Sequence, residues 1–274
     1  MPPSRKRSSK AAESEPEPKR RSSRLSGTQP EPFTESTSST HERLSKPKRK
    51  QTAKSVPTEP DDAVQERAKS KGRATSEDVD VNDIPSVNHD APRHEGVWYW
   101  LLKAEPETRL ENGIDVSFSI DDLRAKKKPE GWDGIRSYAA RNNLRNMNVG
   151  DQAFFYHSNC KKPGIVGIME IVKEFSEDCS ARRPGSAYYD PSSSKEKPRW
   201  SLVHVEFRKK FAVPIHLDEL RGLGLPGKPL EKMQLLRQSR LSVSRVQAEE
   251  WELLCELADT KAQEAGLAHL EGTA

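Results

Sequence analysis

Several features that would place this 274-residue chain in a well-defined class are scarce or missing. No apolar run approaches the roughly 18 residues that a membrane-spanning helix needs. The first ten residues, MPPSRKRSSK, are basic but are not followed by the apolar segment of a secretory signal peptide. The three cysteines, Cys160, Cys179 and Cys255, are odd in number and widely spaced, which argues against a disulfide framework. These absences predict a soluble intracellular protein with free thiols and no membrane association.

Aromatic residues are almost missing from the first third of the chain. Only Phe33 of the 17 aromatic residues precedes residue 97, whereas 11 of the 20 prolines do. A segment rich in Ser, Pro, Glu, Lys and Arg cannot bury enough apolar surface to offset the entropy of ordering it. Residues 1–96 are therefore predicted to be a disordered tail, and residues 97–258, which hold all five tryptophans, to be one domain. Residues 259–274 are predicted to be a flexible C-terminus.

Charge is unevenly distributed, although its formal sum is only +4. Residues 1–50 hold 13 Lys and Arg against 6 acidic residues, residues 51–96 hold 6 against 10, and the remainder is close to neutral. A nearly neutral domain does not bind polyanions through bulk charge. Any binding of nucleic acid therefore requires a local site or the basic tail.

Three short basic clusters in the tail are typical of nuclear import signals. Serines lie within two of them, and phosphorylation there would change the local charge. The alternative is that basic runs in a polar tail have no specific role. The import hypothesis implies a nuclear protein with import receptors as partners, and it assigns the signal to Arg5, Lys6, Arg7, Lys10, Lys19, Arg20, Arg21, Lys46, Lys48, Arg49 and Lys50.

The pattern of residues 97–258 predicts a mixed α+β domain. Aromatic and β-branched runs predict strands at 97–103, 152–158, 164–175 and 199–215. In the last of these runs, successive side chains alternate between the two faces of the strand. One face is expected to lie against the core, with Val203, Val205 and Phe207, and the other carries Leu202, His204 and Glu206. Because strands and helices do not alternate regularly, the pattern favours an α+β sheet or small barrel over a doubly wound fold.

Helices and one long loop complete the predicted domain. Ser119, with Asp122 three residues later, is a helix start signal. Further helices are predicted at 216–224, 229–238 and 244–258, and the last should be capped by Ser244 and seal the domain. The 176–198 stretch is a long loop, and loops of that length usually carry function or are disordered.

Motifs for catalysis, metals and dinucleotides are incomplete. Residues 222–227, GLGLPG, have the glycine spacing of a dinucleotide-binding loop but follow a helix-like segment instead of a strand. His204 and Glu206 form the H-x-E pair of zinc deaminases, but the C-x-x-C partner is missing. There is no G-x-S-x-G elbow. The sequence therefore predicts no metal site, no cofactor and no catalytic residue.

Three stretches combine aromatic rings with polar side chains: YWLLKAEP, WDGIRSYAARNNL and FFYHS. Such combinations suit a planar ligand, since a ring face stacks and amide or hydroxyl groups read the edge. The alternative is that the rings are core and the arginines a solvated helix face. In residues 132–147, a helix would place asparagines on one of two packed faces. Either part of this segment is loop, or Asn142 is buried with hydrogen-bond partners.

The motifs WLLKAEP, WDGIRSYAARNNLRNM, GDQAFFYHSN, GIVGIMEIVKE and YYDPSSSKEKPRWSLVHVEF, in this order, resemble the EVE domain family over residues 97–258. The resemblance implies a PUA-like fold, a small mixed pseudobarrel with short flanking helices, related to domains that read methylated adenine. It also implies a non-enzymatic reader of a modified base, with 5-hydroxymethylcytosine in DNA as the expected ligand. Such a reader flips the base out of the stack into a pocket.

The same resemblance, carried over by position, gives the candidate ligand-binding residues. Trp132 or Tyr156 is expected to stack on the base, Asn142 and Ser158 to read its edge, and Lys103 and Arg136 to bind phosphate or sugar. Ala104, Ser137 and Ala139 differ from the usual family motif. The full candidate set is Trp100, Lys103, Glu105, Trp132, Arg136, Tyr138, Arg141, Asn142, Tyr156, His157 and Ser158.

Two other functional hypotheses remain open. The domain could be an enzyme that acts on modified bases, in which case a paired acid and base should lie in its pocket. Alternatively, the chain could be a nuclear scaffold in which the tail binds partners or nucleic acid.

Overall fold

A seven-stranded mixed sheet forms the centre of the protein, and its long strands are the segments that the sequence predicts as strands. The computed structural model describes residues 80–272. The strands pair in the order β4-β7-β6-β5-β1-β8, and β9 pairs with β7. Their bounds are β1 (Tyr99–Ala104), β4 (Glu130–Gly131), β5 (Gln152–His157), β6 (Gly164–Glu177), β7 (Ser201–His216), β8 (Val243–Val246) and β9 (Leu270–Glu271).

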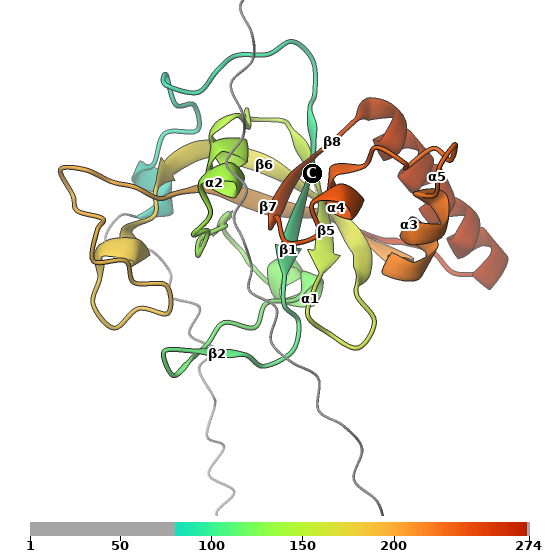
Figure 1. Ribbon diagram of the computed structural model, residues 1–274, viewed down its shortest axis with the longest axis horizontal. Coiled ribbons are helices and arrows are strands. Elements are labelled where there is room, and N and C mark those ends of the chain that lie inside the picture. The colour runs from blue at the N-terminus through green and yellow to red at the C-terminus, as the bar shows by residue number, and fades with distance from the viewer. Residues whose placement is uncertain (1–79, 273–274) are drawn as a thin grey trace, which may run out of the picture. The chain divides into compact units, whose positions relative to one another are not determined.

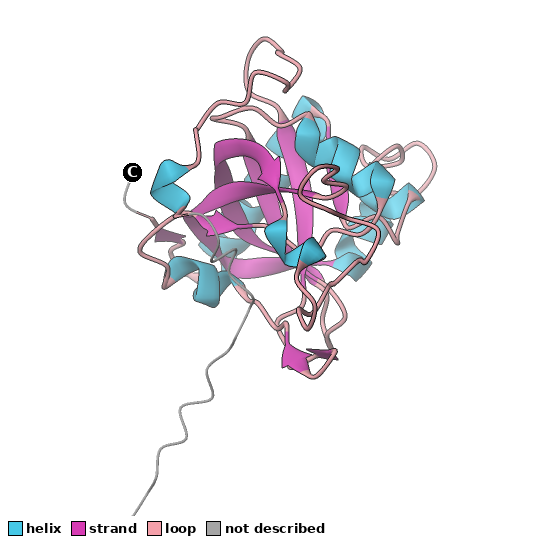
Figure 2. Ribbon diagram, turned by 90° about the vertical axis from the view of Figure 1, so that its left-hand side faces the viewer, coloured by secondary structure: helices cyan, strands magenta, loops and turns pink. Residues whose placement is uncertain are grey.

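The sheet is strongly curved (Figure 2). Its two longest strands, β6 and β7, pair antiparallel, and their register shifts at several points along the ladder. Such bulges bend a strand and increase its twist, so a long hairpin can curl around a core. Among the strands of residues 80–272, only β1 and β5 pair in parallel, which brings their carboxyl ends to the same edge. The predicted α+β class is confirmed, and β6 and β7 lie close to their predicted ranges.

Side chains on the two faces of the sheet belong to two different hydrophobic clusters. In β5, Phe155 packs in the first cluster, whereas Phe154 and Tyr156 pack in the second. Helices α1 (Ile120–Arg124) and α2 (Tyr138–Arg145) contribute to the first cluster. Helices α3 (Leu217–Leu223), α4 (Gln234–Arg237) and α5 (Ala248–Ala265) cover the second, and they gather on one side of the molecule (Figure 1). The short helix α1 begins at the predicted signal, where Ser119 and Asp122 cap it reciprocally.

Strand β7 departs from its expected one-sided burial. Val203 and Val205 are buried as predicted, and Phe207 is half-buried against the first cluster. However, Leu202 and His204 on the other face are fully buried as well. The prediction that Leu202 and His204 face away from the core is therefore wrong, because this part of β7 is covered on both faces, whereas Glu206 is only half-buried.

The C-terminal part also differs from the prediction. Ser244 lies within β8, and α5 is capped by Gln247, whose side chain and that of Glu250 form a capping box. The helix continues to Ala265 and ends at Gly266 in the left-handed conformation. Residues 259–265 are thus helical, and β9 follows instead of a fraying end. The buried positions Ala258 and Ala262 explain the extra turns, since they keep one helix face against the domain.

The folded part begins before residue 97. A short 3-10 helix, η1 (Val81–Asp83), starts the described chain, and the backbone N–H of Asn88 donates to the buried Glu174 carboxylate at 2.7 Å. Arg93 donates to both oxygens of Glu174 at 2.6 Å. The assignment of 80–96 to a disordered tail is therefore wrong, because these polar contacts fix the segment to β6. The basic clusters between Arg5 and Lys50 lie outside the described residues. Within residues 80–272, no helix combines the length and apolar character needed to cross a membrane.

Candidate functional site

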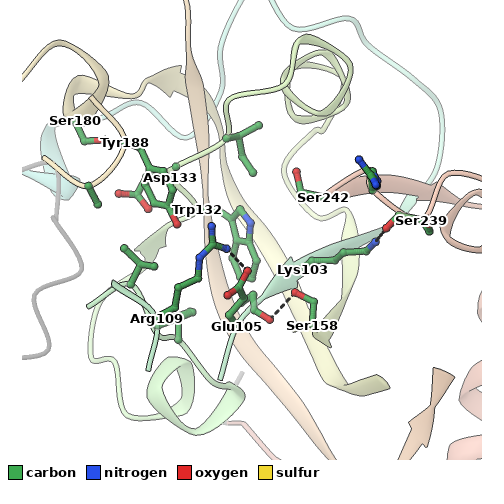
Figure 3. A pocket seen from close by; sticks show the side chains of 17 residues that line it. Lys103, Glu105, Arg109, Trp132, Asp133, Ser158, Ser180, Tyr188, Ser239 and Ser242 are labelled. Carbon is green, nitrogen blue, oxygen red and sulfur yellow. Dashed lines mark hydrogen bonds and ion pairs between the residues drawn. The ribbon is translucent and has the colours of Figure 1, made fainter. Parts of the chain in front are cut away.

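A cavity of about 370 Å³ opens at the carboxyl end of β1 (Figure 3). Its volume falls within the range of about 300–1,000 Å³ that is usual for small-molecule sites. Five stretches of chain that are distant in sequence form its walls. They contribute Lys103, Ala104, Glu105, Arg109, Val116, Phe118, Trp132, Asp133, Gly134, Ile135, Ser158, Ser180, Ala187, Tyr188, Ser239, Arg240 and Ser242.

Trp132 and Phe118 form the aromatic part of the lining. Trp132 directly follows β4, and its backbone N–H donates to the carbonyl of Val203 at 2.8 Å. Its ring packs edge-to-face on Phe118, with ring centroids 6.1 Å apart, and on Phe155 at 5.3 Å. Trp132 is only 2% exposed. The ring is therefore held rigidly by the first hydrophobic cluster and presents a limited surface to the cavity.

Gly134 and Tyr188 build the wall opposite Lys103. Gly134 has φ +74°, and a Cβ atom at this position would lie 2.7 Å from the Tyr188 ring, so only glycine fits the observed backbone. Arg136 lies behind this wall. It donates to the carbonyl of Tyr188 at 2.7 Å and to the buried carboxylate of Asp178 at 2.7 Å. Burial raises the pKa of Tyr188, which keeps its phenol protonated as a hydrogen-bond donor.

The charged lining residues are mostly engaged with neighbours. Arg109 forms ion pairs with Glu105 and with Glu111, and Asn159 also donates to Glu105, at 3.1 Å. The ammonium of Lys103 donates to the carbonyl of Ser239 at 2.8 Å, and burial lowers the pKa of this lysine. The cavity therefore combines two carboxylates, Glu105 and Asp133, with two cations, Lys103 and Arg109, that are bound to neighbouring groups.

A small hairpin and a loop meet at the rim of the cavity. Strands β2 (Leu110–Glu111) and β3 (Ile114–Asp115) pair around Asn112, which has a φ of +50°. The Asn112 side-chain amide donates to the carbonyl of Ala187 at 3.1 Å. Ala187 belongs to the loop that follows the 3-10 helix η2 (Cys179–Arg182). This bond fixes the hairpin to the loop that carries Tyr188.

Four of the sequence-predicted residues line the cavity: Lys103, Glu105, Trp132 and Ser158. They meet because β1 and β5 are parallel neighbours, so that Ser158, just past β5, donates through its backbone N–H to the Ala104 carbonyl at 2.8 Å. The other seven candidates do not line it.

Trp100, Tyr156 and His157 have structural positions. Trp100 is a core residue, and its indole N–H donates to Asp151 at 2.9 Å. Tyr156 is 3% exposed in the second hydrophobic cluster, on the face of the sheet opposite Trp132, and burial raises its pKa to about 12. Nε2 of His157 accepts the backbone N–H of Ile120 at 3.2 Å, and burial lowers the pKa of this histidine to about 4. Both titratable groups are therefore neutral near pH 7.

The α2 candidates lie outside the cavity as well. Tyr138 is half-exposed and stacks on Trp200 with ring centroids 5.1 Å apart. Arg141 donates to the carbonyl of Arg199 at 2.9 Å and also to the side chain of Asn142. The interpretation that Asn142 is buried is wrong, because this residue is exposed. The alternative interpretation is confirmed, since residues 132–137 form a loop before α2.

Sequence reasoning missed the walls formed by Tyr188 and by residues 239–242. Asp133 and Gly134 belong to the stretch WDGIRSYAARNNL, and an Asp-Gly pair is typical of a turn with a left-handed glycine. The serine-rich turn at 239–242 had no such signal. Among residues 80–272, no group of three or more His, Cys, Asp and Glu side chains is arranged to hold a metal ion.

Comparison with known proteins identifies the domain. The sequence model of the EVE domain matches residues 98–257. Thymocyte nuclear protein 1 of Mus musculus is 48% identical over 168 residues, which cover 60% of this chain and 74% of that protein.

Two solved human structures are each 46% identical in sequence to this chain. Each alignment covers 59% of this chain and 98% of the human chain. They are the human THYN1 protein in complex with DNA containing 5-methylcytosine, with a TM-score of 0.58, and the DUF55 domain of human thymocyte nuclear protein 1, with a TM-score of 0.57. A structure from Pseudomonas syringae, 40% identical, gives a TM-score of 0.52. The fold predicted from the ordered motifs is confirmed. This chain belongs to the EVE domain family.

Proposed function

We propose that this protein is a non-enzymatic nuclear reader that binds a modified cytosine of DNA in the cavity beside β1. The observation that carries the proposal is this cavity, with an aromatic floor and polar rim, in a domain 46% identical to a human protein solved with DNA containing 5-methylcytosine. Both 5-methylcytosine and 5-hydroxymethylcytosine are candidate ligands. A base inside a duplex cannot reach a concave site, so the nucleotide has to leave the stack at a cost of a few kcal/mol.

The lining suits a neutral pyrimidine ring. Phe118 and Ile135 provide apolar surface for a methyl substituent, and Tyr188 offers a protonated hydroxyl. The exocyclic amine of cytosine is a donor, and carboxylates are its usual acceptors. Asp133 and Glu105 both supply such a carboxylate, and Asp133 directly follows the aromatic residue Trp132 in the lining. We therefore assign recognition of the amine to Asp133.

The expected preference for a modified base is modest. One buried methyl group contributes about 0.8 kcal/mol, which corresponds to roughly a fourfold difference in affinity. A pocket that also hydrogen-bonds a substituent discriminates more strongly, because an unmatched polar group remains unsatisfied. Comparison of cytosine, 5-methylcytosine and 5-hydroxymethylcytosine therefore reports which substituent the pocket accommodates.

The test is a titration of the full chain with labelled duplexes that differ only in one central cytosine, at a fixed salt concentration of about 100 mM. The modified duplex should bind more tightly, and Asp133→Asn should weaken binding. Asp121→Asn, on α1 and outside the cavity, is the matched control and should bind like the wild type. Equal binding of modified and plain duplexes would overturn the proposal. Release of an altered base would favour the enzyme hypothesis instead.

Nuclear import through the basic tail is part of the same proposal. Its support is the recurrence of three basic clusters between Arg5 and Lys50. A fluorescent fusion of the full chain should accumulate in nuclei, and replacing the clustered Lys and Arg with Gln should distribute it evenly. Unchanged nuclear accumulation would contradict this assignment. Loss of all DNA binding in the same variant would support the scaffold hypothesis, in which the tail binds.

A further inference from the structure

The turn that precedes β8 places an arginine at the mouth of the cavity. The backbone N–H of Leu241 donates to the carbonyl of Gln238 at 2.9 Å and closes a four-residue turn with Ser239 and Arg240 at its centre. The Leu241 side chain is buried in the first hydrophobic cluster. Because Leu241 anchors one end of the turn in the core, the backbone that carries Arg240 has a fixed position.

Lys103 anchors the same turn a second time. Its backbone N–H donates to the carbonyl of Ser242 at 3.0 Å, and its ammonium donates to the carbonyl of Ser239 at 2.8 Å. These two bonds attach the turn to the end of β1, and Figure 3 shows Lys103, Ser239 and Ser242 together on one side of the cavity. The position of Arg240 is therefore tied to the strand that forms the cavity wall.

Arg240 differs from the other cations of the lining. Arg109 is paired with two glutamates, and Lys103 is bound to a backbone carbonyl. Arg240 is exposed and has no hydrogen bond or ion pair with any residue in the described range 80–272. An exposed, unpaired guanidinium on a rigid turn is pre-organised for an external anion.

The charges in the cavity lining indicate where an anion bound by Arg240 would lie. Glu105 and Asp133 are half-buried in the lining, and the cations beside them, Arg109 and Lys103, are already bound to glutamates and to a backbone carbonyl. A phosphate that entered would therefore meet two carboxylates. A neutral base can enter while the phosphates on either side of its sugar remain at the mouth. We infer that Arg240 binds the sugar-phosphate backbone next to the nucleotide whose base occupies the cavity. This inference rests on the proposed function and adds the residue that holds the DNA backbone at the site.

Contact with a phosphate makes a specific prediction about salt. Each phosphate neutralised by a protein cation contributes about 0.9 to the slope of log K against log salt for duplex DNA. Arg240→Gln should therefore bind about 3- to 10-fold more weakly at low salt, and its slope should be shallower by about 0.9. The loss should be the same for modified and plain duplexes, because a backbone contact carries no information about the base. Arg240→Lys should keep the slope of the wild type.

The experiment uses the full chain, duplexes with and without 5-methylcytosine, and salt from about 50 to 200 mM. Arg237→Gln is the matched control, since Arg237 is also exposed, lies three residues earlier in α4 and does not line this cavity. An unchanged slope for Arg240→Gln, at an unchanged melting temperature, would overturn the inference. A loss confined to the modified duplex would also overturn it, since it would make Arg240 a base reader. Failure of the proposed function is separate, because it appears as equal binding of both duplexes by the wild type.

Discussion

Replacement of Gly134 with Ala tests whether Tyr188 forms a rigid wall of the cavity. The backbone of Gly134 has φ +74°, and a Cβ atom there would lie 2.7 and 2.8 Å from two carbons of the Tyr188 ring. Normal carbon contacts are about 3.5–4.0 Å long, so the ring or the loop must move by about 1 Å. The left-handed backbone costs a non-glycine residue about 1–2 kcal/mol, and overpacking adds about 1–3 kcal/mol. We expect Gly134→Ala to destabilise the protein by about 2–5 kcal/mol.

Gly96→Ala is the control for the backbone contribution. Gly96 has a nearly equal φ of +69°, but a Cβ atom there would meet no atom within 4 Å. This variant should therefore lose only the conformational part, about 1–2 kcal/mol. Urea unfolding of both variants measures the two losses, and their difference isolates the contact with Tyr188. Binding of modified DNA should weaken for Gly134→Ala and stay unchanged for Gly96→Ala, because only the first moves the wall of the cavity.

Equal destabilisation by the two substitutions would refute this reasoning, since it would mean that Tyr188 does not press on Gly134. A double-variant cycle provides a second check. In a Tyr188→Ala background the added methyl group has space, so Gly134→Ala should then cost no more than Gly96→Ala. A penalty that persists in that background would place the strain elsewhere.

Three further predictions follow from individual contacts. Asn112→Gly keeps the left-handed turn but removes the bond to the Ala187 carbonyl, so DNA affinity should fall by about fivefold and amide exchange of the loop should accelerate. Arg93→Ala should lower the free energy of unfolding measured in urea, because the Glu174 carboxylate stays buried without its guanidinium partner. Burial lowers the pKa of His204 to about 4. Between pH 6.5 and 4 the unfolded chain therefore binds a proton at this residue more readily than the folded protein does, and the free energy of unfolding falls as the pH decreases through this range. Wild-type stability should drop by about 2 kcal/mol more than that of His204→Leu between pH 7 and 4.5, and parallel pH profiles of the two proteins would exclude this role.

The strands and the α1 cap were predictable from sequence because their signals are local. Residues 152–158 and 164–175 are short apolar runs, and the structure places β5 and β6 there. The Ser119 cap depends on a side chain three residues away, so its geometry is contained in the sequence itself. The error at Ser244 has the same local origin. Both Ser244 and Gln247 precede helix-forming residues, and only the pairing of β8 with β1 decides where the strand ends and α5 begins.

The cavity was only partly predictable, because the residues that form its walls depend on the face of the sheet on which each side chain lies. The run QAFFYHS is apolar on both faces, as expected of a strand covered on both sides, so its pattern does not separate Phe155 from Tyr156. The first contacts Trp132, and the second lies on the opposite face. Similarly, the amide that docks on the sheet is that of Asn143, which donates to the Val243 carbonyl at 2.8 Å, whereas its neighbour Asn142 is exposed. One residue of helical phase separates the two, and a sequence pattern does not resolve it.

Lys103 and Arg136 were expected to bind phosphate or sugar, and the structure gives a physical reason to assign the phosphate contact to Arg240 instead. Arg136 is bound to the buried carboxylate of Asp178, and moving it to a ligand would leave that carboxylate without its charge partner. The ammonium of Lys103 holds the turn on which Arg240 stands. Both cations therefore shape the cavity and its rim, while the exposed Arg240 can bind an anion without breaking an interaction inside the domain. A cavity lined by carboxylates, with an exposed Arg240 that has no ion pair among residues 80–272, suits a neutral base whose sugar-phosphate backbone stays at the mouth.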